Sequence, residues 1–115
     1  MKEAVHQWLE EMTPVSGVLA CGVRYPDQTS ATKSWSDRYP EAALDGAWRS
    51  VADAFQVLKL NRLPGERMRW VYERALLYCE RRKDGACLAF FTHRDPEAVD
   101  LEGVVRLIQE FHALA

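Results

Sequence analysis

The sequence predicts an α+β domain in which a five-stranded antiparallel sheet is sandwiched between helices. Three segments carry apolar residues at helical spacing: residues 2–12, residues 40–60 and the stretch that follows Asp100. Five shorter segments between them have the composition of strands. The predicted order is helix, two strands, long helix, three strands, helix. We expect one domain over residues 1–115, because two domains in a chain of this length would each lack a sufficient core.

The composition is that of a soluble globular protein, with 48% hydrophobic and 28% charged residues. The formal net charge of −2 argues against binding to nucleic acid, which usually requires a basic face. No apolar run approaches the roughly 18 residues that a membrane-spanning helix needs. The first segment, MKEAVHQWLEEM, is amphipathic and acidic, unlike a secretory signal peptide. We therefore expect a cytoplasmic protein without a membrane span.

The first helix is expected to end before Pro14, because proline disfavours helical geometry in the residue that precedes it. Residues 16–23 (SGVLACGV) are small and apolar without alternation, which is typical of a strand covered on both faces. Residues 25–28 predict a turn, and the mostly polar residues 29–36 predict an edge strand. On that edge strand Trp35 fits either a place in the core or a place in a binding surface.

The long helix begins with Pro40 at its first position, where a missing N–H group costs nothing. Its apolar arc is wider than one sheet contact requires, which indicates a helix buried on two sides. The arc comprises Ala43, Leu44, Ala47, Trp48, Val51, Ala54, Phe55, Val57 and Leu58. Gly46 costs about 1 kcal/mol in helix propensity, which another backbone approaching closely would explain.

Residues 67–93 fit two patterns, since part of this stretch also matches a helical stripe. We favour three strands, because pairing Tyr72 with Ala75 and Lys83 with Ala86 aligns the apolar residues across them. One face of the sheet then carries Met68, Trp70, Tyr72, Leu77, Cys79, Leu88 and Phe90. A three-residue turn at residues 83–85 would instead place Cys79 opposite Ala89. Neither register pairs Cys79 with Cys87, so these cysteines and Cys21 are expected to be buried and reduced.

The sequence contains no constellation that predicts catalysis, a metal site or a cofactor, so we expect a protein that is not an enzyme. His6, His93 and His112 lie in three separate elements. The group His93, Arg94 and Asp95 is interpreted as a solvated loop. The basic run at residues 81–83 is interpreted as a solvated turn, with a contact patch for an acidic partner as the alternative.

The order and lengths of these elements resemble the roadblock (dynein light chain) family, which is related to the profilin-like and longin folds. The residues that carry the resemblance are GVLACGV after a short helix, the helix over residues 40–60, the hairpin ALLYCERRKDGACLAFFT and the terminal helix DLEGVVRLIQEFHAL. The resemblance implies a non-enzymatic dimer. In it the third strand pairs with its own copy, and the long helices pack against each other.

The residues support a homodimer independently of the resemblance. A free edge on strand 67–73 bearing Trp70 and Tyr72 would invite aggregation, and the wide apolar arc of the long helix needs a second partner. For Trp48 the sequence leaves two positions open, against the sheet or at the dimer seam. The expected dimer interface comprises Met68, Arg69, Trp70, Val71, Tyr72, Trp48, Val51 and Phe55.

The resemblance also implies binding to other proteins, plausibly a small Ras-like GTPase. The polar residues of the long helix outside its main apolar stripe are the candidates for such contacts: Arg49, Asp53, Gln56 and Lys59. The alternative is a small-molecule-binding sensor domain of profilin-like or PAS-like architecture. A sensor of that kind requires an enclosed apolar pocket between sheet and helix.

Overall fold

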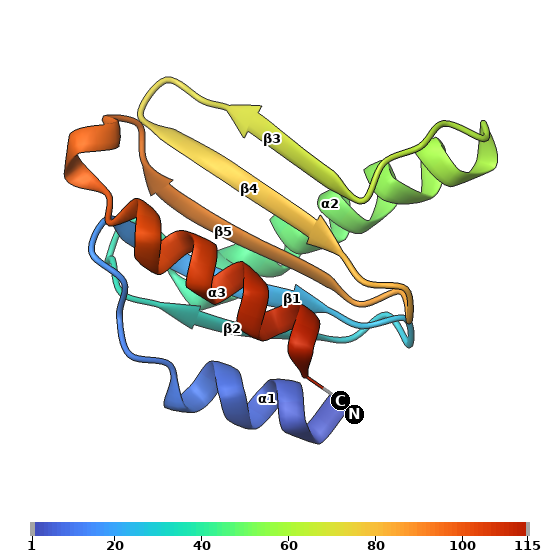
Figure 1. The fold of residues 1–115 in the computed structure, drawn as a ribbon, viewed down its shortest axis with the longest axis horizontal. Coiled ribbons are helices and arrows are strands. Elements are labelled where there is room, and N and C mark those ends of the chain that lie inside the picture. Colours follow the sequence, from blue (N-terminus) through green and yellow to red (C-terminus); the bar gives the residue numbers. More distant parts are fainter. Residues whose placement is uncertain (1, 115) are drawn as a thin grey trace.

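The computed structural model describes residues 2–114. In chain order it contains α1 (Lys2–Glu11), β1 (Val18–Arg24), β2 (Ser30–Ser34), α2 (Glu41–Leu60), β3 (Arg67–Val71), β4 (Ala75–Arg81), β5 (Cys87–His93), the short 3-10 helix η1 (Pro96–Ala98) and α3 (Leu101–Ala113) (Figure 1). The predicted order of helices and strands is confirmed. Residues 1 and 115 of the predicted domain lie outside the described residues.

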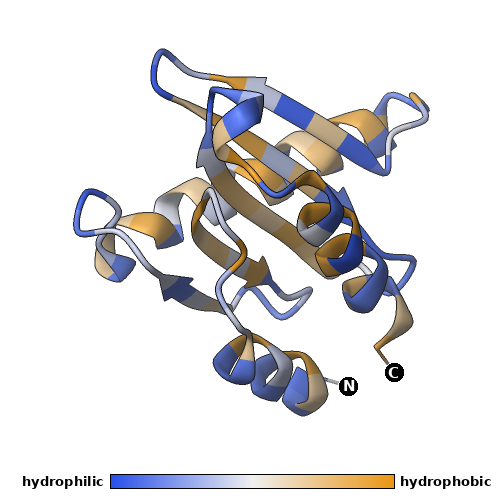
Figure 2. Cartoon of the chain, turned by 60° about the vertical axis from the view of Figure 1, so that its left-hand side comes forward, coloured by the Kyte–Doolittle hydropathy of each residue, from blue (hydrophilic) through white to orange (hydrophobic). Residues whose placement is uncertain are grey.

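The five strands form one antiparallel sheet in the order β2-β1-β5-β4-β3. Helix α2 packs against one face, and α1 and α3 cover the other (Figure 1). Strand β5 lies in the middle, and all of its residues except His93 are buried. Figure 2 shows hydrophobic residues along the central strands and hydrophilic residues at the turns. The predicted sandwich of a sheet between helices is therefore confirmed.

Residues 67–82 form the predicted hairpin, in which Tyr72 donates its N–H to the carbonyl oxygen of Ala75 at 2.9 Å. The preferred register between β4 and β5 was wrong by one residue. Arg82, and not Lys83, lies opposite Ala86, and donates its N–H to the Ala86 carbonyl oxygen at 2.9 Å. The turn therefore has three residues, 83–85, and Cys79 faces Ala89, as the alternative register predicted.

The turn chemistry explains the three-residue loop. Gly85 adopts a φ of 92°, the left-handed conformation that closes a bulged three-residue turn. The Asp84 carboxylate accepts a hydrogen bond from the Ala86 N–H at 3.0 Å, which holds the loop in this shape. Because side chains alternate along a strand, the shift by one residue exchanges the faces of β5. Leu88 and Phe90 consequently pack on the side of α1 and α3, and the side of α2 receives Cys87, Ala89 and Phe91.

Two local predictions at the helix starts are tested by the structure. Helix α3 follows Asp100 as predicted, and the Asp100 side chain accepts a hydrogen bond from the Gly103 N–H at 3.0 Å and so caps the helix. Helix α2 begins at Glu41, one residue later than expected, with Pro40 in an extended conformation before it. The three cysteines are buried as expected, and none of them forms a disulfide within residues 2–114.

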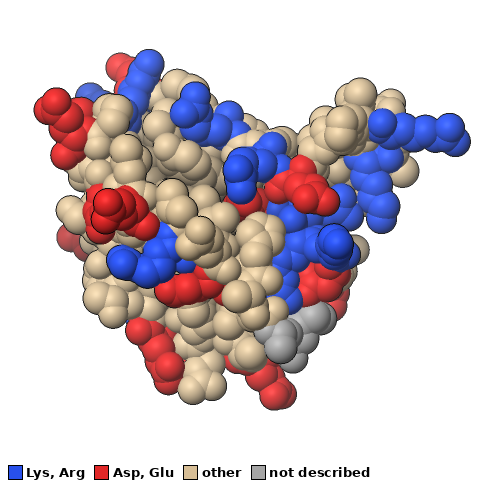
Figure 3. Space-filling view, in the orientation of Figure 1, with Lys and Arg blue, Asp and Glu red and all other residues tan. Residues whose placement is uncertain are grey.

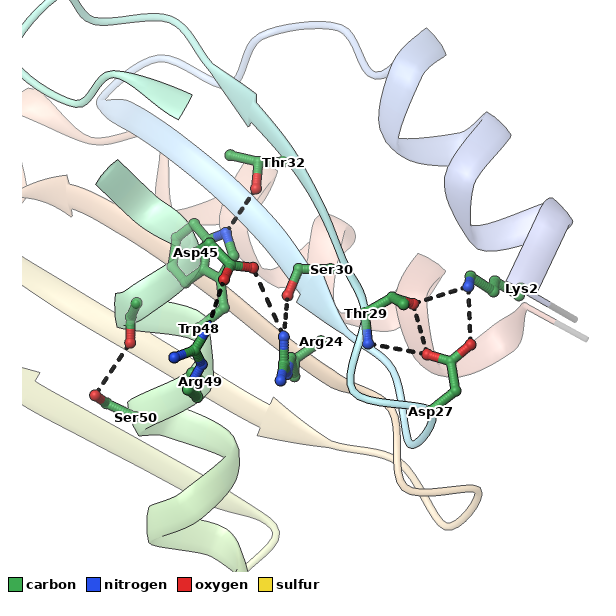
Figure 4. A network of polar contacts seen from close by, with 11 residues as sticks. Lys2, Arg24, Asp27, Thr29, Ser30, Thr32, Asp45, Trp48, Arg49 and Ser50 are labelled. Atoms are coloured by element: carbon green, nitrogen blue, oxygen red, sulfur yellow. Dashed lines mark hydrogen bonds and ion pairs between the residues drawn. The ribbon is translucent and has the colours of Figure 1, made fainter. Parts of the chain in front are cut away.

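Helix α2 comes close to the sheet at Gly22 of β1. The Trp48 indole lies against this glycine, where a Cβ atom would come within 2.1 Å of the indole nitrogen. The same indole N–H donates a hydrogen bond to the Thr32 hydroxyl at 2.9 Å (Figure 4). At Gly46, by contrast, an added Cβ would meet no described atom within 4 Å. The close backbone approach expected at Gly46 is therefore not found within this chain.

We predict that Gly22→Ala lowers the free energy of unfolding by about 1–3 kcal/mol, because the new methyl group must displace the Trp48 indole. The matched control Gly46→Ala adds the same group to an open helix position and should raise the free energy of unfolding by about 1 kcal/mol. Urea denaturation followed by tryptophan fluorescence measures both values. A Gly22→Ala chain as stable as the unsubstituted one would contradict this packing.

Candidate interaction surfaces

Strand β3 lies at the edge of the sheet and has β4 as its neighbour on one side. Tyr72 donates to the Ala75 carbonyl oxygen at 2.9 Å, and Arg81 donates to the Glu66 carbonyl oxygen at 2.8 Å. Because inward and outward positions alternate along an antiparallel strand, the even-numbered residues face β4. The backbone N–H and C=O groups of the odd-numbered residues point to the open edge, namely Arg67, Arg69 and Val71.

The side chains on this edge leave apolar surface in water. Val71 is 58% exposed and Tyr72 44% exposed, whereas Met68 and Trp70 are half-buried against the core on the side of α2. The other edge strand, β2, is protected differently. It is mostly polar, and Lys33 reaches the carbonyl oxygen of Glu10 in α1. Lysine and polar side chains blunt a sheet edge, so β3 presents the edge better suited to pairing.

A buried carboxylate anchors the start of β3 from the side of α3. Glu80 of β4 is almost wholly buried and accepts hydrogen bonds from Arg67 Nε at 2.5 Å and Arg67 Nη2 at 3.1 Å. The His112 ring nitrogen Nε2 lies 3.0 Å from Glu80 Oε1, the oxygen that also accepts from Arg67 Nη2. The hydrogen bonds to Glu80 raise the pKa of Arg67 above its usual range. Glu80 therefore ties both β3 and α3 to the sheet.

His93 ends β5, and Arg94 and Asp95 in the loop after it have structural roles. Arg94 donates from Nη1 to the carbonyl oxygens of Tyr72 at 3.3 Å and Glu73 at 3.2 Å, and so holds the turn between β3 and β4. Asp95 caps η1 by accepting from the Glu97 N–H. Trp35, for which two positions were open, is half-buried against the core on the side of α1 and α3.

Helix α2 presents three stripes, because each residue turns about 100° from the last. The central stripe faces the sheet and comprises Leu44, Trp48, Val51, Phe55 and Leu58. Trp48, Val51 and Phe55, which the sequence placed in the dimer interface, are no more than 1% exposed within the single chain. The sequence correctly predicted that these residues lie on the apolar side of the helix. The sheet of the same chain, and not a second copy, covers them. We therefore leave these three residues out of the proposed interface.

The stripe on one flank of α2 has small side chains, Ala43, Ala47, Ser50, Ala54 and Val57. Three of these residues are exposed, and the two alanines in the middle are half-buried. The exposed fraction of Val57 is 56% and that of Leu60, near the end of the helix, is 72%. In Figure 1 this end of α2 extends beyond β3. This flank and the end of the helix thus expose apolar groups that a second helix could cover.

The stripe on the other flank of α2 is polar and contacts β1. Asp45 lies 3.1 Å from Arg49 and 3.6 Å from Arg24, which also donates to the Ser30 hydroxyl at 3.1 Å (Figure 4). Further along, the four partner-binding candidates, Arg49, Asp53, Gln56 and Lys59, line one surface cleft of about 950 Å³. The structure therefore brings these candidates together.

The basic run at residues 81–83 divides between two environments. Arg82 is buried, lies over the Phe111 ring and donates to the Phe111 carbonyl oxygen at 3.0 Å, which satisfies a carbonyl at the end of α3. Arg82 also pairs with Asp84, and this ion pair lowers the pKa of Asp84. Arg81 and Lys83, on either side of it, line the same cleft as the polar stripe of α2. The solvated-turn interpretation is therefore wrong for Arg82.

Within residues 2–114 no group of three histidine, cysteine or acidic residues is arranged to hold a metal ion. None of the helices in the same range combines the length and apolar character that crossing a bilayer requires.

No family model matches the sequence, and a search of curated proteins found no match. Among solved structures, the chain is similar to MglC from Myxococcus xanthus. The two sequences are 23% identical, the TM-score is 0.42, and the match covers 83% of this chain and 82% of that chain.

We predict that the three thiols react slowly while the chain is folded. Burial raises the pKa of Cys21 and Cys79 to about 12 and that of Cys87 to about 11, so the reactive thiolate is scarce at mildly alkaline pH. Labelling with iodoacetamide should be at least about 100-fold slower in the native chain than in the urea-unfolded chain at the same pH. Mass spectrometry after quenching measures both rates. A native cysteine modified as fast as in the unfolded chain would contradict this environment.

Proposed function

We propose that the protein is a cytoplasmic, non-enzymatic homodimer that binds a small Ras-like GTPase and regulates it without supplying chemistry. The open edge of β3 is the observation that supports the dimer. Three successive outward residues there offer unpaired backbone groups, and apolar side chains flank them. Pairing of β3 with its own copy across a twofold axis would bond these groups and cover the exposed side chains.

The charges along β3 favour one register of this pairing. An axis at Arg69 would place the two Arg69 side chains directly opposite each other, and like charges in that position destabilise a sheet. An axis at Trp70 instead places Arg69 opposite Val71 of the partner subunit and joins the two Trp70 rings. The Arg69–Val71 pair occurs twice in a symmetric dimer, so this register separates the two Arg69 charges.

Helix α2 would complete the interface through its small-residue flank. The side chains of Ala43, Ala47 and Ala54 allow a second helix backbone to approach closely. Val57 and Leu60, both largely exposed in the single chain, would be buried where the ends of the two helices meet. A stable interface of this kind buries more than about 1,000 Å² in total, which an edge strand of five residues alone cannot supply.

We predict that Val71→Pro disrupts the dimer and leaves the monomer folded. The Val71 N–H points away from β4, so its loss breaks no hydrogen bond inside the chain but removes one at the proposed seam. The control Val71→Ala keeps the N–H and should remain a dimer. Light scattering coupled to size exclusion at micromolar concentration measures the mass. An unsubstituted chain that is a monomer would refute the dimer, as would a folded, fully dimeric Val71→Pro variant.

The register yields a second prediction. Val71→Lys should weaken the dimer about three- to tenfold, because it places a like charge opposite Arg69 of the partner subunit on both sides of the axis. The double variant Arg69→Glu/Val71→Lys should recover most of the lost affinity. Dissociation constants from sedimentation equilibrium measure the coupling between the two positions. Effects that simply add in the double variant would contradict a twofold axis at Trp70 without contradicting the dimer itself.

The proposed GTPase partner rests on the resemblance to the roadblock family together with the shared location of the polar candidates on α2. Arg49→Glu and Lys59→Glu should weaken binding to the partner while leaving the dimer intact, because both residues lie on the flank of α2 away from the proposed seam. Arg106→Glu on α3, on the other side of the sheet, is the matched control. The test is affinity capture from native cell extract, followed by titration of each captured GTPase loaded with either nucleotide.

Capture of no GTPase would overturn this partner. Retention of a metabolite through purification, seen by native mass spectrometry, would favour the sensor alternative instead. That alternative needs an enclosed apolar cavity between α2 and the sheet. The space there is filled by Trp48, Phe55 and Phe91, with the Trp48 and Phe91 ring centres 5.8 Å apart. This packing supports the proposal of a protein-binding module.

A further inference from the structure

A cleft runs between the polar flank of α2 and the tips of two hairpins. The turn between β1 and β2 and the turn between β4 and β5 form one wall, and the C-terminal half of α2 forms the other. Its volume is about 950 Å³, near the upper end for small-molecule sites. Figure 3 shows lysine and arginine side chains gathered at this end of the molecule, beside the hairpin tips and the end of α2.

The lining of the cleft is strongly basic in a chain whose formal net charge is −2. Only two acidic residues line it, Asp53 and Asp84, and Asp84 is already paired with Arg82. The cations come from all three segments: Arg24, Arg49, Lys59, Arg81 and Lys83. Five cations thus face two carboxylates in this cleft.

Much of this positive charge is not neutralised by the chain. Arg24 and Arg49 share the single carboxylate of Asp45. Arg81, Lys83 and Lys59 form no ion pair with any residue in the range 2–114. Cations of like sign that face a common cleft raise the local potential and attract an anionic group. The cleft is therefore complementary to a ligand that carries several negative charges.

We propose that this cleft binds an acidic, extended segment of a partner protein. The inference rests on the proposed function in one respect, since it assumes that the chain is a protein-binding module. In this proposal the polar flank of α2 recognises carboxylates, and Arg24, Arg81 and Lys83 of the hairpins belong to the same contact surface. It requires neither the dimer nor a GTPase.

The arrangement suits a peptide better than a compact polyphosphate. Compact phosphate sites converge backbone N–H groups, often at a helix N-terminus, on one point. Here the side of α2, and not its N-terminus, lines the cleft. The cations are instead spread along the cleft, and Asp53 and Gln56 stand among them. An extended peptide can place carboxylates beside the cations and a hydrogen-bond donor beside Asp53.

Several weak contacts would add up in such a complex. Each exposed ion pair contributes less than about 1 kcal/mol, so recognition requires several of them together and should depend on salt. Complementary charge of this kind raises the rate of association and selects among partners. An acidic segment should therefore bind quickly, with modest affinity, and weaken as the ionic strength rises.

The test uses the full-length protein and a fluorescein-labelled peptide in which glutamate alternates with serine, followed by fluorescence anisotropy at low salt. The double variant Arg81→Glu/Lys83→Glu should bind this peptide at least about tenfold more weakly. The matched control Arg38→Glu/Arg106→Glu changes the net charge equally at two exposed sites away from the cleft and should bind within about twofold of the unsubstituted chain. Circular dichroism checks that both variants are folded.

Three further measurements on the unsubstituted chain decide the class of ligand. The same peptide with glutamine in place of glutamate should not bind, and raising the salt to about 0.5 M should largely abolish binding of the acidic peptide. Tripolyphosphate and single-stranded DNA should compete only weakly. Absence of binding to the acidic peptide, an equal loss in the control variant, or tighter binding of tripolyphosphate or DNA would each overturn the inference.

The test of the cleft and the test of the GTPase partner can succeed or fail independently. Binding of the acidic peptide by a chain that captures no GTPase would support the cleft and refute the GTPase. Capture of a GTPase by a chain that does not bind the acidic peptide would refute the cleft alone.

Discussion

The unpaired edge of β3 is the constraint on which the proposed assembly depends. Antiparallel pairing with β4 uses every second backbone group of β3 and directs the others outward. Backbone groups at a sheet edge readily pair with another strand, and proteins usually protect such edges with charge or a covering element. On β3 the arginines supply some protection, but Val71 and the adjacent Tyr72 remain exposed. A partner strand at this edge would bond the unpaired backbone groups and prevent non-specific aggregation through them.

The elements around β3 hold this edge in place. Glu80 binds Arg67 at the start of the strand, and Arg94 holds the turn at its end. Helix α2 packs on the sheet face opposite α3, and its central stripe is buried there. One flank of the helix carries small side chains and the other flank carries polar ones. The flanks separate two roles. The small-residue flank suits a second copy of α2, and the polar flank with the hairpin tips suits an acidic partner. One helix can thus serve assembly and recognition on different sides.

The sequence predicts most of the fold because its signals are local. Apolar spacing locates the helices, the Asp100 side chain begins α3, and residues 67–82 form strands despite a competing helical pattern. The β4–β5 register was missed because it depends on the conformation of Gly85, which composition alone does not settle. The role of Arg82 was missed for a different reason. Its partner, the end of α3, is 29 residues away and becomes a neighbour only in the folded chain.

The positions of the candidate interaction residues were predicted in part. The exposed residues of β3 and the four polar residues of α2 lie where their patterns indicate, whereas Trp48, Val51 and Phe55 are core residues. An apolar arc on a helix does not say which part of it faces its own sheet. The cleft could not be derived from sequence, because its walls are three segments that only the strand order brings together.

The most direct test of the dimer is hydrogen exchange of individual β3 amides by NMR, as a function of protein concentration. The outward amides of Arg67, Arg69 and Val71 should exchange fast in dilute monomer and become protected as the dimer forms. The inward amides of Met68, Trp70 and Tyr72 should be protected at both concentrations, since they bond to β4. Outward amides that exchange fast at every concentration would contradict pairing of β3 with its own copy.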